Sequence, residues 1–365
     1  MRMNVSHSIN FPAIRGVQAG REYYVSMCPL RLLCRIFFFD EQDLPPEVRA
    51  QRVLNKGRIP EMTRYIVDNP KDYIFSAITA SIDSDVEFTP LGARGDDQKV
   101  GTLHVPMGAR FIINDGQHRR AAIEEALKQK PEVGNEAIAV VFFLDVGLAR
   151  CQQMFADLNR YAIRPSRSLG LLYDHRDDKA KLAKLMVMKS DVFKNIVEME
   201  KTTLSPRSRK LFTLSALYHA SSDLINGVAN GSIEHDAELA TEFWEAASKQ
   251  FPEWLWVRDG KMAAGEVRQD FIHSHGIALQ AIARAGNALL RHAGAGWKTR
   301  LRMLKEIDWS RNNAKLWEGR AIIGGRVSKA TNNVVLTTNV VKRKLGIELS
   351  PEEQKVEDAF MRRHK

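Results

Sequence analysis

The apolar pattern of the chain changes near residue 166, and this change constrains the fold more than any other feature of the sequence. Before it, strand-like segments rich in aromatic and β-branched residues alternate with helix-like segments. The apolar run 138–144 has the length of a strand and predicts a buried central one. After it, apolar residues recur three and four apart, which predicts helices over 168–190, 211–227, 236–250 and 266–292. We expect an α+β chain, with a mixed-sheet domain over residues 1–166 and a mainly α-helical region over residues 167–365.

Shorter helices and strands are predicted from local composition and from the prolines and glycines that mark their ends. The expected strands lie at residues 23–27, 32–39 and 73–82, and after a loop over 83–101 a hairpin joins 103–105 to 110–113. The expected helices run over residues 45–54, 60–69, 117–130 and 148–158. Ser350-Pro351-Glu352-Glu353 has the order of a capping box, so it predicts the start of a last helix.

The formal net charge is +10, which favours polyanionic partners. Two basic clusters are candidates for contact with double-stranded DNA: Arg207, Arg209 and Lys210 before one helix, and Lys342, Arg343 and Lys344 near the end of the chain. A merely solvated basic surface would explain either cluster taken alone. We expect a DNA-binding protein, and a homo-oligomer.

No stretch of about 18 apolar residues is present, and residues 1–16 lack the apolar core of a signal peptide. We therefore expect a cytoplasmic protein that does not enter a membrane. The three cysteines are too scattered for a usual zinc site, and His273 and His275 diverge on a helix, so no metal site is expected among them. Cys28 is either a buried reduced thiol or, if the turn at Pro29 exposes its sulfur, a redox-responsive one.

The most informative stretch is the turn at residues 115–120, where an apolar strand ends, a glycine follows and a helix begins. The first turn of this helix carries His118, Arg119 and Arg120, although a helix N-terminus disfavours positive charge. A bound anion would relieve the conflict, with Gly116 allowing close approach and Arg119 offering two donors to phosphate oxygens. Alternatively, the two arginines pair with Glu124 and Glu125 at helical spacing.

Asp115-Gly116-Gln117-His118-Arg119 is the signature of the DGQHR-domain proteins. A second element, residues 155–160 followed by Pro165-Ser166, resembles the downstream element of the same group. The arrangement is similar to the ParB N-terminal and sulfiredoxin fold, in which such a turn holds nucleotide phosphates. Gln117 stands where sulfiredoxin has its reactive cysteine, so sulfiredoxin chemistry is not expected. The opening at residues 10–20 and the long helical tail look most like the DndB family, which regulates DNA phosphorothioate modification genes negatively.

This resemblance implies ATP as the candidate ligand of the turn, together with Mg²⁺. The residues implied for phosphate or nucleotide contact are Gly116, Gln117, His118, Arg119, Arg120, Asp157 and Asn159. Asn159 is alternatively a left-handed cap that ends its helix.

Three functions remain open from the sequence. The first is a repressor that binds promoter DNA and senses a nucleotide at the turn. The second is a ParB-like NTPase or a DNA-nicking enzyme, with Asp115 holding a metal or acting as base and His118 transferring a proton. The third is a subunit that interacts with other DNA sulfur-modification proteins.

Overall fold

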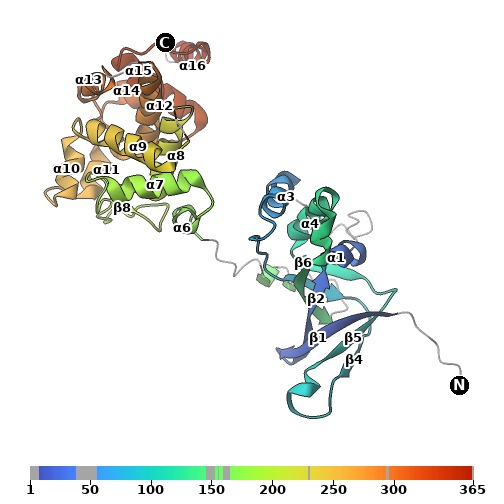
Figure 1. The fold of residues 1–365 in the computed structure, drawn as a ribbon. Coiled ribbons are helices and arrows are strands. Elements are labelled where there is room, and N and C mark those ends of the chain that lie inside the picture. Colours follow the sequence, from blue (N-terminus) through green and yellow to red (C-terminus); the bar gives the residue numbers. More distant parts are fainter. Residues whose placement is uncertain are drawn as a thin grey trace, which may run out of the picture. The chain divides into compact units, whose positions relative to one another are not determined.

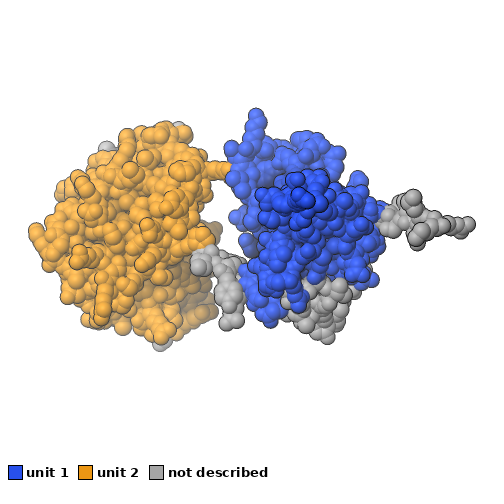
Figure 2. Space-filling view, turned by 90° about the horizontal axis from the view of Figure 1, so that it is seen from below, with its two compact units in different colours: residues 1–163 blue, residues 164–365 orange. Residues whose placement is uncertain are grey.

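The computed structural model describes residues 8–37, 56–144, 153–154, 156–158, 165–228, 231–292 and 296–363. Contacts within the chain divide it into two compact units, unit 1 (residues 1–163) and unit 2 (residues 164–365), coloured separately in Figure 2. Each unit has its own hydrophobic core. The first unit is a mixed sheet with helices and the second is mainly helical, so the expected α+β class is confirmed.

Unit 1 is built on a seven-stranded sheet in the order β4-β5-β1-β2-β7-β3-β6. Strands β3 and β7 run parallel to each other, and the other neighbours are antiparallel. The strands are β1 (Ser8–Gln18), β2 (Arg21–Pro29), β3 (Ile78–Ile82), β4 (Glu87–Pro90), β5 (Val100–Pro106), β6 (Phe111–Asp115) and β7 (Ala137–Leu144). Helices α1 (Leu30–Ile36), α3 (Ile59–Asp68) and α4 (Gln117–Gln129) are grouped together in Figure 1.

The core of unit 1 lies on one face of this sheet, because buried and more exposed residues alternate along β2, β5 and β7, whereas β3 is buried throughout. In β7, for example, Ile138, Val140 and Phe142 are buried and their neighbours are more exposed. Leu33 of α1 and Ile123 of α4 belong to the same cluster, so the helices cover that face. The expected central strand at 138–144 is confirmed, since β7 lies between β2 and β3.

Four expectations for unit 1 are wrong in whole or in part. The strand expected at 73–82 is formed only over Ile78–Ile82. The segment expected as a strand at 32–39 is helical in its described part, because Leu30, Leu33 and Phe37 fall at helical spacing and are all buried. The expected loop at 83–101 contains β4 and the first residues of β5. The expected hairpin does not form, since β5 pairs with β1 and β4 whereas β6 pairs with β3. The expected helix at 45–54 lies outside the described residues.

Unit 2 is mainly helical, as expected. Its helices are α6 (Arg167–Tyr173), α7 (Asp178–Lys189), α8 (Leu214–Ile225), α9 (Ile233–Ser248), α10 (Pro252–Arg258), α11 (Ala264–Asp270), α12 (Gly276–His292), α13 (Trp297–Leu301), α14 (Ala314–Trp317), α15 (Thr331–Lys344) and α16 (Pro351–Arg363). Two short strand pairs accompany them: β8 (Val197–Glu198) with β9 (Phe212–Thr213), and β10 (Ile322–Ile323) with β11 (Arg326–Val327).

Helix α12 is central to unit 2, because it packs against both α8 and α15. Ala281 and Ile282 of α12 are fully buried, as are Leu217 and Leu224 of α8. The start of α16 is the expected capping box: the Ser350 amide donates to Glu353 Oε2 at 2.8 Å, and the Glu353 amide donates to Ser350 Oγ at 3.3 Å.

Among the described residues, no helix combines the length and the apolar character needed to cross a bilayer. The same residues contain no group of three or more His, Cys, Asp or Glu side chains placed to hold a metal ion.

Candidate functional site

The turn between β6 and α4 depends on Gly116, whose φ of 111° is a left-handed conformation that other residues rarely adopt. A Cβ atom there would lie 2.9 Å from Ile78 Cγ1 and 3.1 Å from Arg119 Nη2. The space above the glycine is therefore occupied by the guanidinium of Arg119. No side chain caps the start of α4, and its first turn carries no acid, so the partial positive charge of the helix end is not offset there.

Arg119 is held within unit 1 by three contacts. Its Nη2 donates to Asp115 Oδ2 at 2.6 Å and to the Ala77 carbonyl at 3.0 Å, and its Nη1 donates to Ser76 Oγ at 2.9 Å. The suggested pairing of Arg119 with an acid one turn later is therefore wrong. These contacts use three of the five N–H donors of Arg119, and its charged partner, the Asp115 carboxylate, remains partly exposed.

Arg120 and Gln117 point into the fold. The Arg120 side chain is buried, pairs with Glu124 Oε2 at 2.9 Å and donates to the Cys34 carbonyl. The alternative of pairing at helical spacing is confirmed for this arginine. Gln117 is also buried, and its Nε2 donates to the Ile113 carbonyl at 3.0 Å. Both side chains therefore form contacts within unit 1 beside the turn.

His118 is a titratable group of the turn besides Asp115. It is half-buried, and this burial lowers its pKa, with further lowering from the nearby charges of Arg58 and Arg119. The imidazole is accordingly neutral at neutral pH, a form in which one ring nitrogen accepts a proton and the other donates a hydrogen bond.

Met154, which directly precedes the predicted downstream element, lies next to the end of β6. Asn114, which immediately precedes the turn, donates from Nδ2 to Met154 Sδ at 3.3 Å and to Ser81 Oγ at 2.7 Å. Asp157 is exposed and accepts a hydrogen bond from Gln153 Nε2 at 2.8 Å. Asn159 lies outside the described residues, and a ligand role for Asp157 stays a prediction.

Cys28 does not have the exposed sulfur on which its redox hypothesis depended. The residue is fully buried, and this burial, followed by the proximity of Cys34, raises the pKa of its thiol to about 12. At neutral pH the thiol is protonated, the less reactive form.

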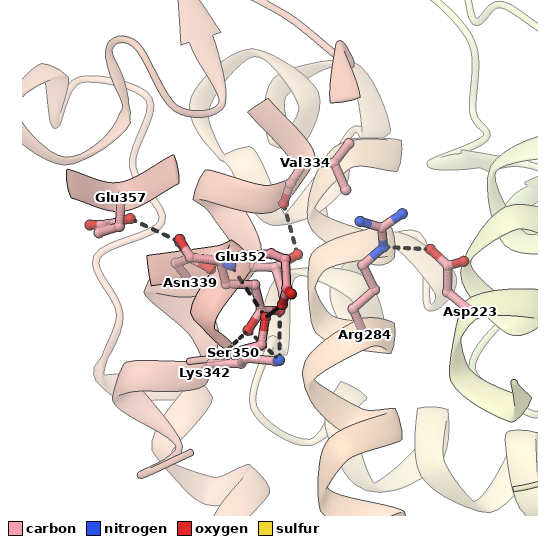
Figure 3. A network of polar contacts seen from close by, with 10 residues as sticks. Asp223, Arg284, Val334, Asn339, Lys342, Ser350, Glu352 and Glu357 are labelled. Carbon is pink, nitrogen blue, oxygen red and sulfur yellow. Dashed lines mark hydrogen bonds and ion pairs between the residues drawn. The ribbon is translucent and has the colours of Figure 1, made fainter. Parts of the chain in front are cut away.

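The cations predicted near the end of the chain are largely paired within the fold. Lys342 Nζ contacts Glu353 Oε1 at 2.6 Å, and Arg343 Nη1 contacts Glu357 Oε1 at 2.9 Å. Figure 3 shows the polar network around these residues. Lys344 is exposed and has no ion pair within the described part of the chain. Two of the three cations predicted to contact DNA at this cluster are therefore paired with acids of the fold, and their contact with DNA stays a prediction.

A second predicted cluster lies on what we name the basic loop, residues 199–211. The loop starts after β8 and ends before β9, and these two strands pair with each other, so its ends are held together. Arg268 of α11 fixes its backbone by donating to the carbonyls of Ser205, at 2.7 Å, and of Lys210.

The basic side chains of the loop differ in whether they form contacts within the fold. Arg207 and Arg209 are exposed and form no ion pair or hydrogen bond with another described residue. The Lys210 ammonium instead donates to the Asn195 carbonyl at 2.9 Å, so it contributes to the anchoring of the loop. The loop therefore presents two arginines on a fixed backbone.

The basic loop also forms one wall of a pocket of about 570 Å³ in unit 2. Thr202 lines this pocket together with Arg167, His219, Gly276 and Lys329, which come from four other parts of the sequence. Sequence analysis did not select His219, because no motif or charged cluster in the sequence marks its position in α8. The fold alone brings these residues together.

A sequence model of the DndB family, described as DNA-sulfur modification-associated, matches residues 11–348 of the chain. No curated protein matches the chain, and no solved structure does. The matched range covers nearly all of the sequence and includes the turn at residues 115–120, the basic loop and the pocket. The chain therefore belongs to the DndB family of DNA-sulfur modification-associated proteins.

Proposed function

We propose that the protein is a DNA-binding negative transcriptional regulator of the genes for DNA phosphorothioate modification. Membership of the family supports a role in that system. The observation that carries the DNA-binding part is the basic loop, where Arg207 and Arg209 are exposed on a backbone fixed by Arg268. Because the loop backbone is already fixed, only the two side chains would need to become ordered on contact with phosphates. A homo-oligomer would present two such loops to a palindromic promoter.

We further propose that ATP with Mg²⁺ binds at the turn and weakens DNA binding. The helix start there has no side-chain cap, and Arg119 supplies a positive charge beside it. In this proposal a phosphate replaces Asp115 as the partner of Arg119, and the released carboxylate of Asp115 becomes available to Mg²⁺. If nucleotide and DNA favour different conformations, each weakens the binding of the other by the same factor.

A second candidate function is a slow NTPase or a DNA nickase that acts at the same turn. It is favoured by the neighbouring placement of the partly exposed Asp115 carboxylate and the neutral imidazole of His118. Metal-dependent turnover that disappears in Asp115→Asn would support it. The absence of turnover across nucleotides, metals and supercoiled DNA would contradict it.

The test is equilibrium binding of a promoter duplex and of a scrambled duplex of equal length, at several salt concentrations. Replacing Arg207 and Arg209 by Gln should weaken binding and reduce the slope of log affinity against log salt by about 2. The control is Arg302→Gln with Lys315→Gln, which removes two exposed cations of unit 2 that have no ion-pair partner among the described residues. The proposal would be contradicted if the loop variant bound DNA with the same affinity, and the same slope of log affinity against log salt, as this control.

The nucleotide part is tested separately by adding ATP and Mg²⁺ to the same assay. ATP should weaken promoter binding by wild type and have less effect on Arg119→Ala. Nucleotide binding that leaves the DNA affinity of wild type unchanged would contradict the coupling.

A further inference from the structure

The pocket beside the basic loop has the size of a ligand site, since its volume of about 570 Å³ lies within the usual range for small-molecule pockets. Its walls come from the start of α6, the basic loop, the starts of α8 and α12, and the segment before α15. Part of the lining is apolar, with Leu204, Leu211 and Phe212, and part is hydroxylic, with Thr202 and Thr203.

The charged residues that line this pocket all have basic side chains. Arg167 and Lys329 are at its rim, and neither forms an ion pair or a hydrogen bond with any other residue that the structure describes. Arg268 also lines the pocket, but its donors are used by the backbone of the basic loop. The nearby acid Asp223 is occupied, because it accepts from Arg284 Nε and Gln280 Nε2 at 2.8 Å each (Figure 3 shows the contact with Arg284).

The mutual repulsion of these groups contributes to lowering the pKa values of Lys329 and His219. The pKa of Lys329 is lowered, first by the loss of surrounding water at the pocket and then by the charge of Arg167. The pKa of His219 is lowered to about 4, first by burial and then by the charges of Arg167 and Lys329, against a weaker raising effect of Asp223. An anion in the pocket would relieve this repulsion.

Two longer helices also begin at the pocket. Ser215 and Ala216 lie in the first turn of α8, and Gly276 is the first residue of α12. Neither helix has an acid in its first turn. A Cβ at Gly276 would lie 3.2 Å from Ala216 Cβ and 3.4 Å from Lys329 Nζ, so the two helix starts and the ammonium group are close neighbours. Their partial positive charges add to those of the side chains.

We infer that this pocket binds the phosphate groups of a ligand, with Arg167 and Lys329 as the charged contacts and the start of α12 as the source of backbone donors, since the Ser215 and Ala216 amides of α8 already donate to Ser168 and Thr213. The apolar wall formed by the basic loop and β9 accommodates the remainder of a ligand the size of a nucleotide. This is a separate site from the turn at residues 115–120 and does not rest on nucleotide binding there. The phosphates come either from a free phosphorylated molecule or from the backbone of bound DNA.

The test compares wild type with the double variant Arg167→Gln/Lys329→Gln by calorimetric titration with inorganic tripolyphosphate. Loss of two charge-assisted contacts should weaken binding by about tenfold or more. The control variant Arg302→Gln/Lys315→Gln has the same change in net charge and should stay within about twofold of wild type. Both replaced pocket residues are exposed and without ion pairs in the described chain, and an unchanged thermal unfolding midpoint verifies the fold.

The two sources of phosphate give different results. A free ligand is supported when tripolyphosphate binds wild type and the control but is weakened in the pocket variant. A DNA phosphate is supported when tripolyphosphate does not bind, yet the pocket variant loses duplex affinity relative to the control. Unchanged binding of both probes in the pocket variant overturns the inference. The same two binding measurements on Arg119→Ala report on the turn alone. They therefore distinguish a failure of this inference from a failure of nucleotide binding at the turn.

Discussion

Arg320 and Glu357 form a two-pronged ion pair inside unit 2, with Nη2 to Oε1 at 2.7 Å and Nη1 to Oε2 at 2.9 Å. Both side chains are almost fully buried, at 9% and 1% exposed. Burial alone would raise the pKa of Glu357, but hydrogen bonds from Arg320 and Asn339 and the charge of Arg343 outweigh it, so the net shift is downward. The carboxylate therefore stays charged and joins α16 to the segment that follows α14.

Replacing Arg320 by Met should destabilise unit 2 by about 3 kcal/mol, because it leaves a buried carboxylate without its main partner. Tryptophan fluorescence during urea unfolding measures this directly, since all six tryptophans belong to unit 2. The double variant Arg320→Met/Glu357→Leu should recover much of the loss, because it removes both charges. Equal stability of Arg320→Met and wild type would show that the pair contributes nothing.

Replacing Gly116 by Ala should loosen the start of α4, because alanine is strained at a φ of 111° and its Cβ would contact Ile78 and the guanidinium of Arg119. We expect amide hydrogen exchange in the helix to accelerate by about tenfold, which corresponds to about 1.4 kcal/mol. Gly108→Ala is the matched control, since no atom lies within 4 Å of the Cβ it would add. Similar rates of amide hydrogen exchange in α4 of the two variants would contradict the expected backbone strain at residue 116.

The pKa of His219 should rise from about 4 toward its ordinary value in Arg167→Gln, because the charge of Arg167 is one of the causes that lower it. NMR titration of the histidine ring protons measures this shift. Arg302→Gln should leave His219 unchanged. An unaltered pKa in the Arg167 variant would mean that the guanidinium does not face the imidazole across the pocket.

Unit 2 should lose stability on acidification, in part through His275. Burial is the main cause that lowers its pKa to about 4, and the Arg268 carbonyl lies 2.8 Å from its Nε2. Because the unfolded chain binds a proton near pH 6.5, the stability from the neutral ring is present above that pH and is lost as pH falls toward about 4.

When the pH falls from about 7.5 to about 5, protonation linked to His275 should lower the free energy of unfolding by at most about 2 kcal/mol. Urea unfolding of wild type and of His275→Gln at the two pH values measures it. The glutamine variant should show a smaller loss, while His292→Gln, at an exposed position, should show the full one. An identical loss in all three proteins would assign the pH dependence to other groups.

The features that the sequence predicts well are those encoded by neighbouring residues. The start of α16 is one, because Ser350 and Glu353 satisfy each other's amides three positions apart. The glycine turn before α4 is another, since a strand, a left-handed residue and a helix follow one another directly. Both are local signals that need no knowledge of the remaining chain.

Features that depend on distant partners could not be obtained in this way. Arg119 is held by Ser76 and Ala77, about forty positions earlier, which no spacing within the helix indicates. The cations Lys342 and Arg343 look free in the sequence, but the packing of α16 on α15 brings acids to them. A charge cluster in a sequence therefore predicts a binding surface only after its intramolecular partners are known.

The pairing of β8 with β9 has a consequence for how unit 2 tolerates changes in chain length. Because Val197 and Phe212 are partners, the intervening segment leaves and re-enters the fold at one place. Insertions and deletions between these points change the length of a loop whose ends stay paired. The entropy cost of closing a loop grows only slowly with its length, and the helices outside the loop stay intact. Changes in the length of this segment should therefore cost unit 2 less stability than changes in the buried interior of its helices.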